Sequence, residues 1–377
     1  MTYTVLLTPW FVYVLLKNRR LTLPLAILSI AAIISGFHAS DGVAFSSLVT
    51  SYLLFSCWVI FTFYLAHWIK QFGNLEPLYY RLLAINAVLV LAAVLTFPIN
   101  GIRPLLWQVE PVALFVEPIP RLKLFTYEAS YYSLMMAPLA LYFFLRMMAR
   151  KISHPLLVFI AVAFPLLLSM SFGVLACIAL SLIAVSILYF RQLIGVRHNL
   201  LMIFFVVLAL VALSATIHHV FPDNPISKRL GLILSWQDSS ARGRLVDAFV
   251  LGYKIAESKS LAYGAGLGQI KHAGHDLIMD YYNYRPVVGN VMRIPNSMGE
   301  WLATFGLLGF FLKLAAEWFL FFKTRVYKHP YRFAVFVFIF IYQFTGSYII
   351  NPAEAVLWVI AFAWRPCSAQ ETATFAS

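Results

Sequence analysis

The sequence predicts an all-α polytopic membrane protein with about eleven transmembrane helices and one large loop. Of its 377 residues, 62% are hydrophobic and only 11% are charged, whereas soluble domains are roughly one quarter charged. A chain of this composition cannot cover its own surface with polar side chains. Its apolar runs are long and continuous, so we expect them to cross the membrane as helices.

Eleven apolar segments are long enough, or nearly so, to cross a bilayer as helices, which takes roughly 20 residues each. They lie at about 3–16, 21–37, 43–66, 82–98, 131–148, 155–171, 172–190, 199–217, 297–322, 333–349 and 352–364. The first and last segments are short, and the break between 155–171 and 172–190 is weakly marked. The sequence therefore sets the number of spans to within one or two.

Basic residues alternate with these spans and predict the orientation. Fifteen of them fall in alternate short loops and in the C-terminal tail, namely Lys17, Arg19, Arg20, Lys70, Arg81, Arg146, Arg150, Lys151, Arg191, Arg197, Lys323, Arg325, Lys328, Arg332 and Arg365. Because cytoplasmic loops collect Lys and Arg, we expect these loops in the cytoplasm and the N-terminus outside. The net charge of +13 is thus explained first by topology, and no nucleic-acid partner is predicted.

Two outer loops carry charge that orientation does not require. One spans residues 99–130, and the other spans about 218–295 with nine Lys/Arg, six Asp/Glu and four His. Long loops are translocated largely regardless of their charge, so these cations are the better candidates for chemistry. The predicted organisation is an N-terminal transmembrane bundle over 1–217, a large loop over 218–296, and C-terminal helices with a tail over 297–377.

Within the large loop, Ser239 to Lys259 has the apolar spacing of an amphipathic helix. The glycine-rich stretch Gly264–Gly268 ends that helix and is predicted to form a turn, because it lacks the Lys-Ser/Thr of a phosphate-binding loop. His272 and His275 have no third ligand at a diagnostic position, so no metal site is predicted.

Four arginines of the large loop, Arg242, Arg244, Arg285 and Arg293, are candidates for binding phosphate. The guanidinium is planar and permanently charged, and it recognises phosphate through paired hydrogen bonds. The alternative is a solvated loop, or attraction of these cations to anionic lipid headgroups. Nearby, Tyr281 and Tyr282 could stack on sugars or pack the loop, as could Tyr284.

Glu128 lies where the first outer loop re-enters the membrane, and Arg121 precedes it in the same loop. A partly desolvated carboxylate at such a position suits a general base, while the alternative is a charge favoured by a helix N-terminus. Glu300 lies one turn inside a span and could cap its helix or pair with a loop arginine. Lys313 and Glu317 are four residues apart, and we interpret them as a structural ion pair.

Three segments in order resemble the bacterial O-antigen polymerase and ligase superfamily. Ser240-Ala241-Arg242-Gly243-Arg244 resembles the Gly-Arg start of that family's large periplasmic loop, and Ala262 to Gly268 resembles its glycine-rich turn. Asn296-Ser297 through Glu300 to Gly306-Leu307-Leu308-Gly309 resembles its junction between loop and membrane. The motifs cover about 70 residues, and each is degenerate, so their ordered combination carries the resemblance.

One departure from the family pattern affects the choice within it. Ligases of this superfamily typically have a histidine, a proposed catalytic residue, just before the junction asparagine. In this chain that position is Pro295, which can neither accept nor donate a proton. The resemblance therefore implies a polymerase rather than a ligase.

The resemblance implies a fold with GT-C-like architecture in the bacterial inner membrane, with its active site facing the periplasm. The implied activity is metal-independent, cofactor-free polymerisation of undecaprenyl-pyrophosphate-linked oligosaccharide units into a surface polysaccharide. Partners would be those lipid-linked units, the bilayer and a chain-length regulator protein. Arg244, Glu128 and Arg242 would be catalytic, and Arg293, Arg285, Arg121, Tyr281 and Tyr282 would bind pyrophosphate or glycan.

Two other functions stay open at this point. An O-antigen ligase would transfer lipid-linked glycan to lipid A core, and would need another residue in place of the missing histidine. A flippase or other transporter for lipid-linked oligosaccharides belongs to a different class. Transporters tend to have ionisable residues at mid-membrane and inverted repeats, whereas this chain has most of its charge in outer loops.

Overall fold

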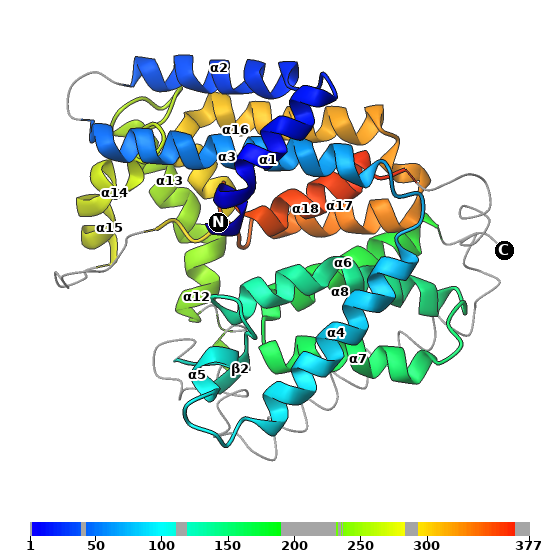
Figure 1. Cartoon of the computed structure of the whole chain (residues 1–377). Helices are drawn as coiled ribbons and strands as arrows, with labels where there is room; N and C mark the ends of the chain where they lie inside the picture. Colours follow the sequence, from blue (N-terminus) through cyan, green and yellow to red (C-terminus); the bar gives the residue numbers. More distant parts are fainter. Residues whose placement is uncertain are drawn as a thin grey trace. The chain divides into compact units, whose positions relative to one another are not determined.

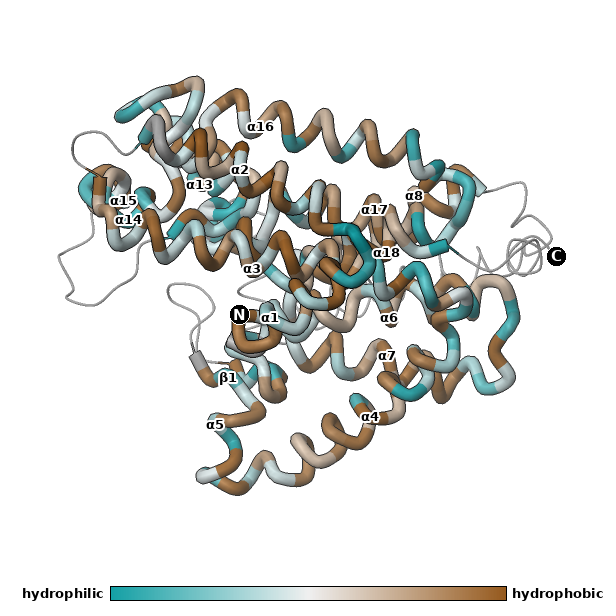
Figure 2. Tube along the Cα trace, turned by 45° about the horizontal axis from the view of Figure 1, so that its top comes forward, coloured by the Kyte–Doolittle hydropathy of each residue, from teal (hydrophilic) through white to brown (hydrophobic). Residues whose placement is uncertain are grey.

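The structure, a computed structural model, is mostly helical. It describes residues 2–38, 43–110, 119–189, 231–232, 235, 237–282 and 293–365. Within these ranges, three helices are long and apolar enough to cross a membrane: α3 (Phe45–Ile69), α4 (Glu76–Leu95) and α16 (Ser297–Lys323). Hydrophobic residues predominate along α4 and recur along α16 (Figure 2). Several shorter apolar helices accompany them, as expected for a membrane protein.

The helix bounds differ from the predicted spans in places. The helix expected at 82–98 begins earlier, at Glu76, and the one expected at 333–349 ends at Tyr342, which leaves 343–351 outside regular helix. The predicted span 199–217 lies outside the described residues. The first outer loop adds a short helix, α5 (Arg103–Leu106), and an antiparallel hairpin of β1 (Trp107–Glu110) and β2 (Ile119–Leu122), so the fold is not purely helical.

The chain divides into two compact units, each formed from separate parts of the sequence. The first contains residues 1–71, 243–325 and 340–364, and the second contains 72–242, 326–339 and 365–377. Each unit therefore combines apolar helices with segments of the predicted loops, and neither unit is one continuous stretch of the sequence.

The first unit contains the long helices α3 and α16 together with most of the large loop. Its other helices are α1 (Thr2–Lys17), α2 (Thr22–Phe37), α13 (Ala248–Glu257), α14 (Ile270–Ala273), α15 (His275–Tyr282) and α18 (Pro352–Ala363). α3 packs against α1, α2 and α18, and α13 packs along α16 (Figure 1). Ala248, Leu251, Ile255 and Ala303 are among the buried residues of the apolar core between α13 and α16.

The second unit is built around α6 (Ala129–Met148), most of whose residues are buried. It also contains α4, the hairpin, α7 (Pro155–Ser169), α8 (Phe172–Leu188) and most of α17 (Pro330–Tyr342). α6 contacts α7 and α8, and hydroxyl groups join helices inside the core. Tyr79 and Tyr331 lie 2.6 Å apart at their hydroxyl oxygens, and Tyr331 donates to the carbonyl oxygen of Pro138.

The glycine-rich turn of the large loop joins the middle of α16. The amides of Ala265 and Gly266 donate to the carbonyl oxygens of Ala303 and Thr304 at 2.8 and 2.9 Å, and those of Leu307 and Leu308 donate to Leu261 and Ala262 at 2.9 and 3.1 Å. This pairing interrupts α16 at Gly306, whose φ is 64°. The span predicted as one continuous helix thus consists of two helical parts joined by a strand-like contact with the loop.

The predicted turn over Gly264–Gly268 is confirmed, and the chain there lies closely against the helices α3 and α16. A Cβ at Gly264 would lie 2.5 Å from the backbone nitrogen of Gly306, and a Cβ at Gly268 would lie 2.4 Å from the carbonyl oxygen of Ser47 in α3. The buried side chain of Gln269 completes the contact, since it accepts from the amide of Ala44 and donates to the carbonyl oxygen of the same residue. Only glycine fits such an approach.

Gly264→Ala should destabilise the protein by about 2–5 kcal/mol, the sum of left-handed backbone strain and overpacking. The reason is that the added methyl would overlap backbone atoms of Thr304 and Gly306 while φ stays at 76°. Thermal unfolding of the purified protein in detergent measures the effect. Gly173→Ala is the matched control, because nothing lies within 4 Å of a Cβ there. Equal unfolding temperatures for the two variants would contradict this account of the turn.

Candidate functional site

The start of the large loop's helix carries two of the candidate arginines. α12 (Ser239–Arg242) continues through a π-helical turn over Gly243–Asp247 into α13, so the amphipathic helix predicted over 239–259 is confirmed, with an irregular turn inside it. Arg242 is exposed and Arg244 is half-buried. π-helical turns widen the spacing of side chains and occur frequently at functional sites, which makes Arg244 the stronger candidate of the two.

Asn296 ties the backbone of Arg244 to the start of α16. Its side-chain oxygen accepts from the amide of Gly299, so it caps the helix, and its side-chain nitrogen donates to the carbonyl oxygens of Arg244 and Phe344. Asn296 is completely buried. Three segments distant in sequence therefore meet at one amide group, and the position of Arg244 depends on it.

α13 and the first part of α16 approach each other through small residues. A Cβ at Gly252 would lie 2.7 Å from the carbonyl oxygen of Gly299, and a Cβ at Gly299 would lie 2.7 Å from that of Ala248. With no side chain between them, the two helices are held at backbone distance. The loop helix that carries Arg244 at its start is thus fixed directly on the long apolar helix α16.

The connection between α17 and α18, residues 343–351, is held by polar side chains of neighbouring segments. Glu300 accepts from the amide of Ile349 at 2.8 Å, and the indole of Trp58 donates to the carbonyl oxygen of Asn351 at 3.1 Å. Amides of the α16 start donate to carbonyl oxygens of the same connection. The carboxylate of Glu300 therefore accepts a backbone hydrogen bond, and it also interacts electrostatically with the guanidinium of the loop residue Arg293.

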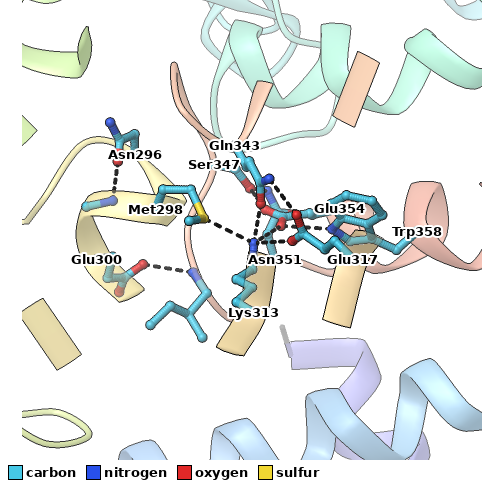
Figure 3. Close-up of polar contacts among 12 residues, drawn as sticks. Asn296, Met298, Glu300, Lys313, Glu317, Gln343, Ser347, Asn351, Glu354 and Trp358 are labelled. Carbon is cyan, nitrogen blue, oxygen red and sulfur yellow. Dashed lines mark hydrogen bonds and ion pairs between the residues drawn. The ribbon is translucent and has the colours of Figure 1, made fainter. Parts of the chain in front are cut away.

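An ion cluster lies among α16, the connection and α18 (Figure 3). The ammonium of Lys313 is 3.0 Å from a carboxylate oxygen of Glu317 and 3.7 Å from one of Glu354, and it donates to the side-chain oxygen of Gln343. Gln343 in turn donates to Glu317 at 2.8 Å. The predicted Lys313–Glu317 pair is confirmed and belongs to a larger buried network.

The tyrosines predicted to contact sugar take part in the packing of the loop. The hydroxyl of Tyr281 donates to Asp247 at 2.9 Å, and the ammonium of Lys254 lies 5.5 Å from the centre of the Tyr281 ring. Tyr281 and Tyr282 are partly buried against the core of α13. Arg293 is exposed, three residues before Asn296, whereas Arg285 and Tyr284 lie outside the described residues.

Glu128 and Arg121 belong to the second unit, in the first outer loop. Glu128 is the N-cap residue of α6, and its carboxylate accepts from the hydroxyl of Ser130. Arg121 pairs with Gln108 in the hairpin register, and the side chain of Gln108 accepts from the amide of Ala129 at 3.0 Å. The hairpin thus fixes the start of α6, where Glu128 lies at the helix N-terminus as the structural alternative expects.

The candidate residues therefore fall into two groups. Arg244, Arg293, Tyr281 and Tyr282 are brought together in the first unit around α13 and the start of α16, and Arg121, Glu128 and Arg242 belong to the second unit. In the described ranges, no three His, Cys, Asp or Glu side chains gather closely enough to hold a metal ion. The ring of His272 instead contacts the hydroxyl of Ser47 at 3.0 Å.

Sequence reasoning missed Gln343 and Glu354 as members of the ion cluster, and it missed the multiple contacts of Asn296. Glu354 is almost fully buried in the first turn of α18, within an apolar run. Its signal was available, because an ionisable residue inside a span is a functional candidate by default. Its partner Lys313 lies on a different helix, α16, so local spacing in the sequence does not reveal the pair. Comparison with known proteins gave no match to a protein-family model and no match to a curated protein.

Asn296→Ala should destabilise the protein more than Asn296→Ser. Serine can still cap α16, so the two variants differ by the capping contribution of about 1 kcal/mol. Both lose the donors to Arg244 and Phe344, and a buried carbonyl without its partner costs about 1–3 kcal/mol. Thermal unfolding in detergent ranks wild type, serine and alanine. A serine variant as stable as wild type would show that the hydrogen bonds to the carbonyl oxygens of Arg244 and Phe344 do not stabilise the protein.

Proposed function

We propose that this chain is an inner-membrane glycosyltransferase that polymerises undecaprenyl-pyrophosphate-linked oligosaccharide units into a surface polysaccharide. The observation that carries the proposal is the meeting of three segments, through contacts of Arg244, of the glycine-rich turn and of Asn296 that all lie in the first unit. The Arg242–Arg244 segment, the glycine-rich turn and the Asn296–Gly309 junction, which together resemble the O-antigen polymerase family, are joined by direct hydrogen bonds and glycine contacts. Resemblance in sequence order alone would not require such contacts.

The proposed reaction transfers a growing chain from its lipid carrier to a sugar hydroxyl on a second unit. The hydroxyl oxygen forms a bond to the anomeric carbon of the growing chain. The bond from that carbon to the pyrophosphate oxygen breaks, and undecaprenyl pyrophosphate leaves with the electron pair. The negative charge that develops on the leaving group is what catalysis must stabilise.

Arg244 is the residue we assign first to the leaving group. Its backbone is fixed by Asn296, and its side chain is half-buried in the π-helical turn that leads into α13. A guanidinium in a partly desolvated position stabilises charge more strongly than one in open water. Arg242, Arg293 and Arg285 are assigned to the same pyrophosphate, and Tyr281 and Tyr282 to the glycan.

Glu128 is the proposed base that takes the proton of the acceptor hydroxyl, with Arg121 nearby in the loop to bind substrate. Its carboxylate at the start of α6 already accepts a hydrogen bond from Ser130, so the group is oriented before substrate binds. Arg121 and Glu128 both belong to the second unit.

The polymerase is favoured over the ligase because Pro295 stands where ligases carry histidine. Deleting the gene separates the two activities. Loss of a polymerase leaves single repeat units on the carrier and on the cell surface, whereas loss of a ligase spares lipid-linked polymer. Turnover by purified protein in detergent, with no membrane gradient, would exclude a flippase.

Arg244→Ala should lower polymerisation about 100-fold or more, the usual effect of removing one preorganised group that stabilises developing charge. The assay is the ladder of surface polysaccharide in a polymerase-null strain that carries the matching repeat unit, with protein levels checked in the same cells. Lys271→Ala, which removes a cation exposed on α14, is the control. Long chains at wild-type abundance from the Arg244 variant would exclude Arg244 from the mechanism.

Glu128→Gln should lower polymerisation about 100-fold or more, since general base catalysis contributes 10²–10⁴ in rate. Glutamine keeps an oxygen that can accept from Ser130 but cannot take a proton at neutral pH. Ser130→Ala is the companion variant, because it removes the contact and keeps the carboxylate. Unchanged chain ladders from the glutamine variant would exclude Glu128 as the base, and its role would then be only that of the N-cap residue of α6.

A further inference from the structure

A cavity and an apolar groove both border the glycine-rich turn. The cavity has a volume of about 410 Å³ and is lined by Ile34 of α2, by His38 and Val43, and by Lys259, Ser260, Tyr263, Gly264 and Ala265. The groove, of about 470 Å³, is bordered by Leu261, Ala262, Leu307, Leu308 and Phe311. The same short stretch of chain borders both, because Leu261 and Ala262 lie between Ser260 and Tyr263. Both belong to the first unit.

We propose that this pair of hollows binds the lipid carrier, with the phosphate end in the cavity and the first isoprene units in the groove. This inference rests on the proposed function, which supplies an anionic, single-chain isoprenoid as the substrate. It adds a site on α2, the turn and α16 that the assignment of Arg244 does not include.

The cavity offers groups that recognise phosphate. Lys259 contributes an ammonium, which is a point charge that pairs well with phosphate oxygens, and Ser260 contributes a hydroxyl. His38 lies across the cavity, with one ring nitrogen 2.9 Å from the carbonyl oxygen of Ile34 and the other 3.0 Å from that of Gly264.

The groove suits a hydrocarbon chain because its backbone polar groups are already used. The amides of Leu307 and Leu308 donate to the carbonyl oxygens of Leu261 and Ala262. The side chains of Leu308 and Phe311 are 49% and 60% exposed, so apolar surface is available near the cavity that contains Lys259. Because α16 is interrupted at Gly306, the groove lies just where the loop meets the apolar part of the helix.

The occupant follows from the two hollows together. A free phosphate would use the cavity and leave the groove empty, and an uncharged lipid chain would use the groove alone. A phosphorylated isoprenoid uses both, and its single chain suits a groove bordered by five residues. Burial of apolar surface and pairing of charge would then contribute to the same binding event.

The test measures binding of undecaprenyl phosphate to the full-length protein in detergent, by native mass spectrometry or microscale thermophoresis. Lys259→Gln should weaken binding about tenfold, as expected when a charge-assisted contact is lost. Leu308→Trp, which fills the groove, and Phe311→Ala, which removes part of its wall, should each weaken binding severalfold or more. Thermal unfolding of each variant verifies that the protein is folded.

Lys271→Gln and Leu312→Trp are the matched controls. Lys271 is exposed on α14, and Leu312 is 59% exposed on α16, and neither borders either hollow. Both should bind like wild type. Unchanged binding by Lys259→Gln and Leu308→Trp, or equal weakening by their controls, would overturn the inference.

Competition separates the possible ligand sources. Inorganic pyrophosphate and phosphatidylglycerol should displace undecaprenyl phosphate poorly, and equal displacement by either would overturn the assignment to an isoprenoid carrier. The outcome is distinct from that of the proposed function. If Arg244→Ala polymerises normally while Leu308→Trp loses lipid binding, the proposed function fails and the lipid site stands. If lipid binding is unaffected while Arg244→Ala loses polymerisation, only the lipid site fails.

Discussion

The interruption of α16 at Gly306 is the constraint on which the first unit depends. A helix in an apolar environment must satisfy every backbone amide and carbonyl group internally or from a neighbour. At Gly306 the hydrogen bonds within the helix are interrupted. Residues 261–266, at the glycine-rich turn, provide the backbone partners in their place. The turn can do so because Gly264 and Gly306 let two backbones approach more closely than side chains allow. Loop and membrane helix are therefore one folding unit.

The same requirement explains the polar residues around the α17–α18 connection. Residues 343–351 are not helical, although they lie beside apolar helices. Their backbone groups form hydrogen bonds with the side chains of Asn296, Glu300 and Trp58. The ion cluster of Lys313 uses Gln343 of the connection as one of its partners. A buried ion pair is costly to desolvate and adds little net stability, but it does specify one arrangement of the helices. We interpret the cluster as the device that fixes where the connection lies against α16.

Local patterns in the sequence predicted the features that depend on neighbouring residues. Apolar runs gave most helix positions, the spacing after Ser239 gave the loop helix, and the glycine run gave the turn. The end of α17 was predicted seven residues too late, at residue 349, because residues 343–349 carry no charge that would mark the end of a span. Their non-helical backbone is paired with long-range partners. The partners that local spacing missed are Arg244 and Phe344 for Asn296, and Gln343 for Lys313. They come from segments about 30–50 residues away, so no local period reveals them.

The way in which Arg244 is held bears on what its side chain can do. Asn296 contacts the carbonyl oxygen of Arg244, and the helix of which Arg244 is part is pressed against α16 by the Gly252–Gly299 contact. The residue is thus positioned through its backbone, and this contact does not occupy the guanidinium. A side chain held through its own charged group would have to break that bond before it could bind an anion. A backbone tether avoids that competition and holds the segment in place beforehand. This is the preorganisation that the proposed role of Arg244 at a leaving group requires.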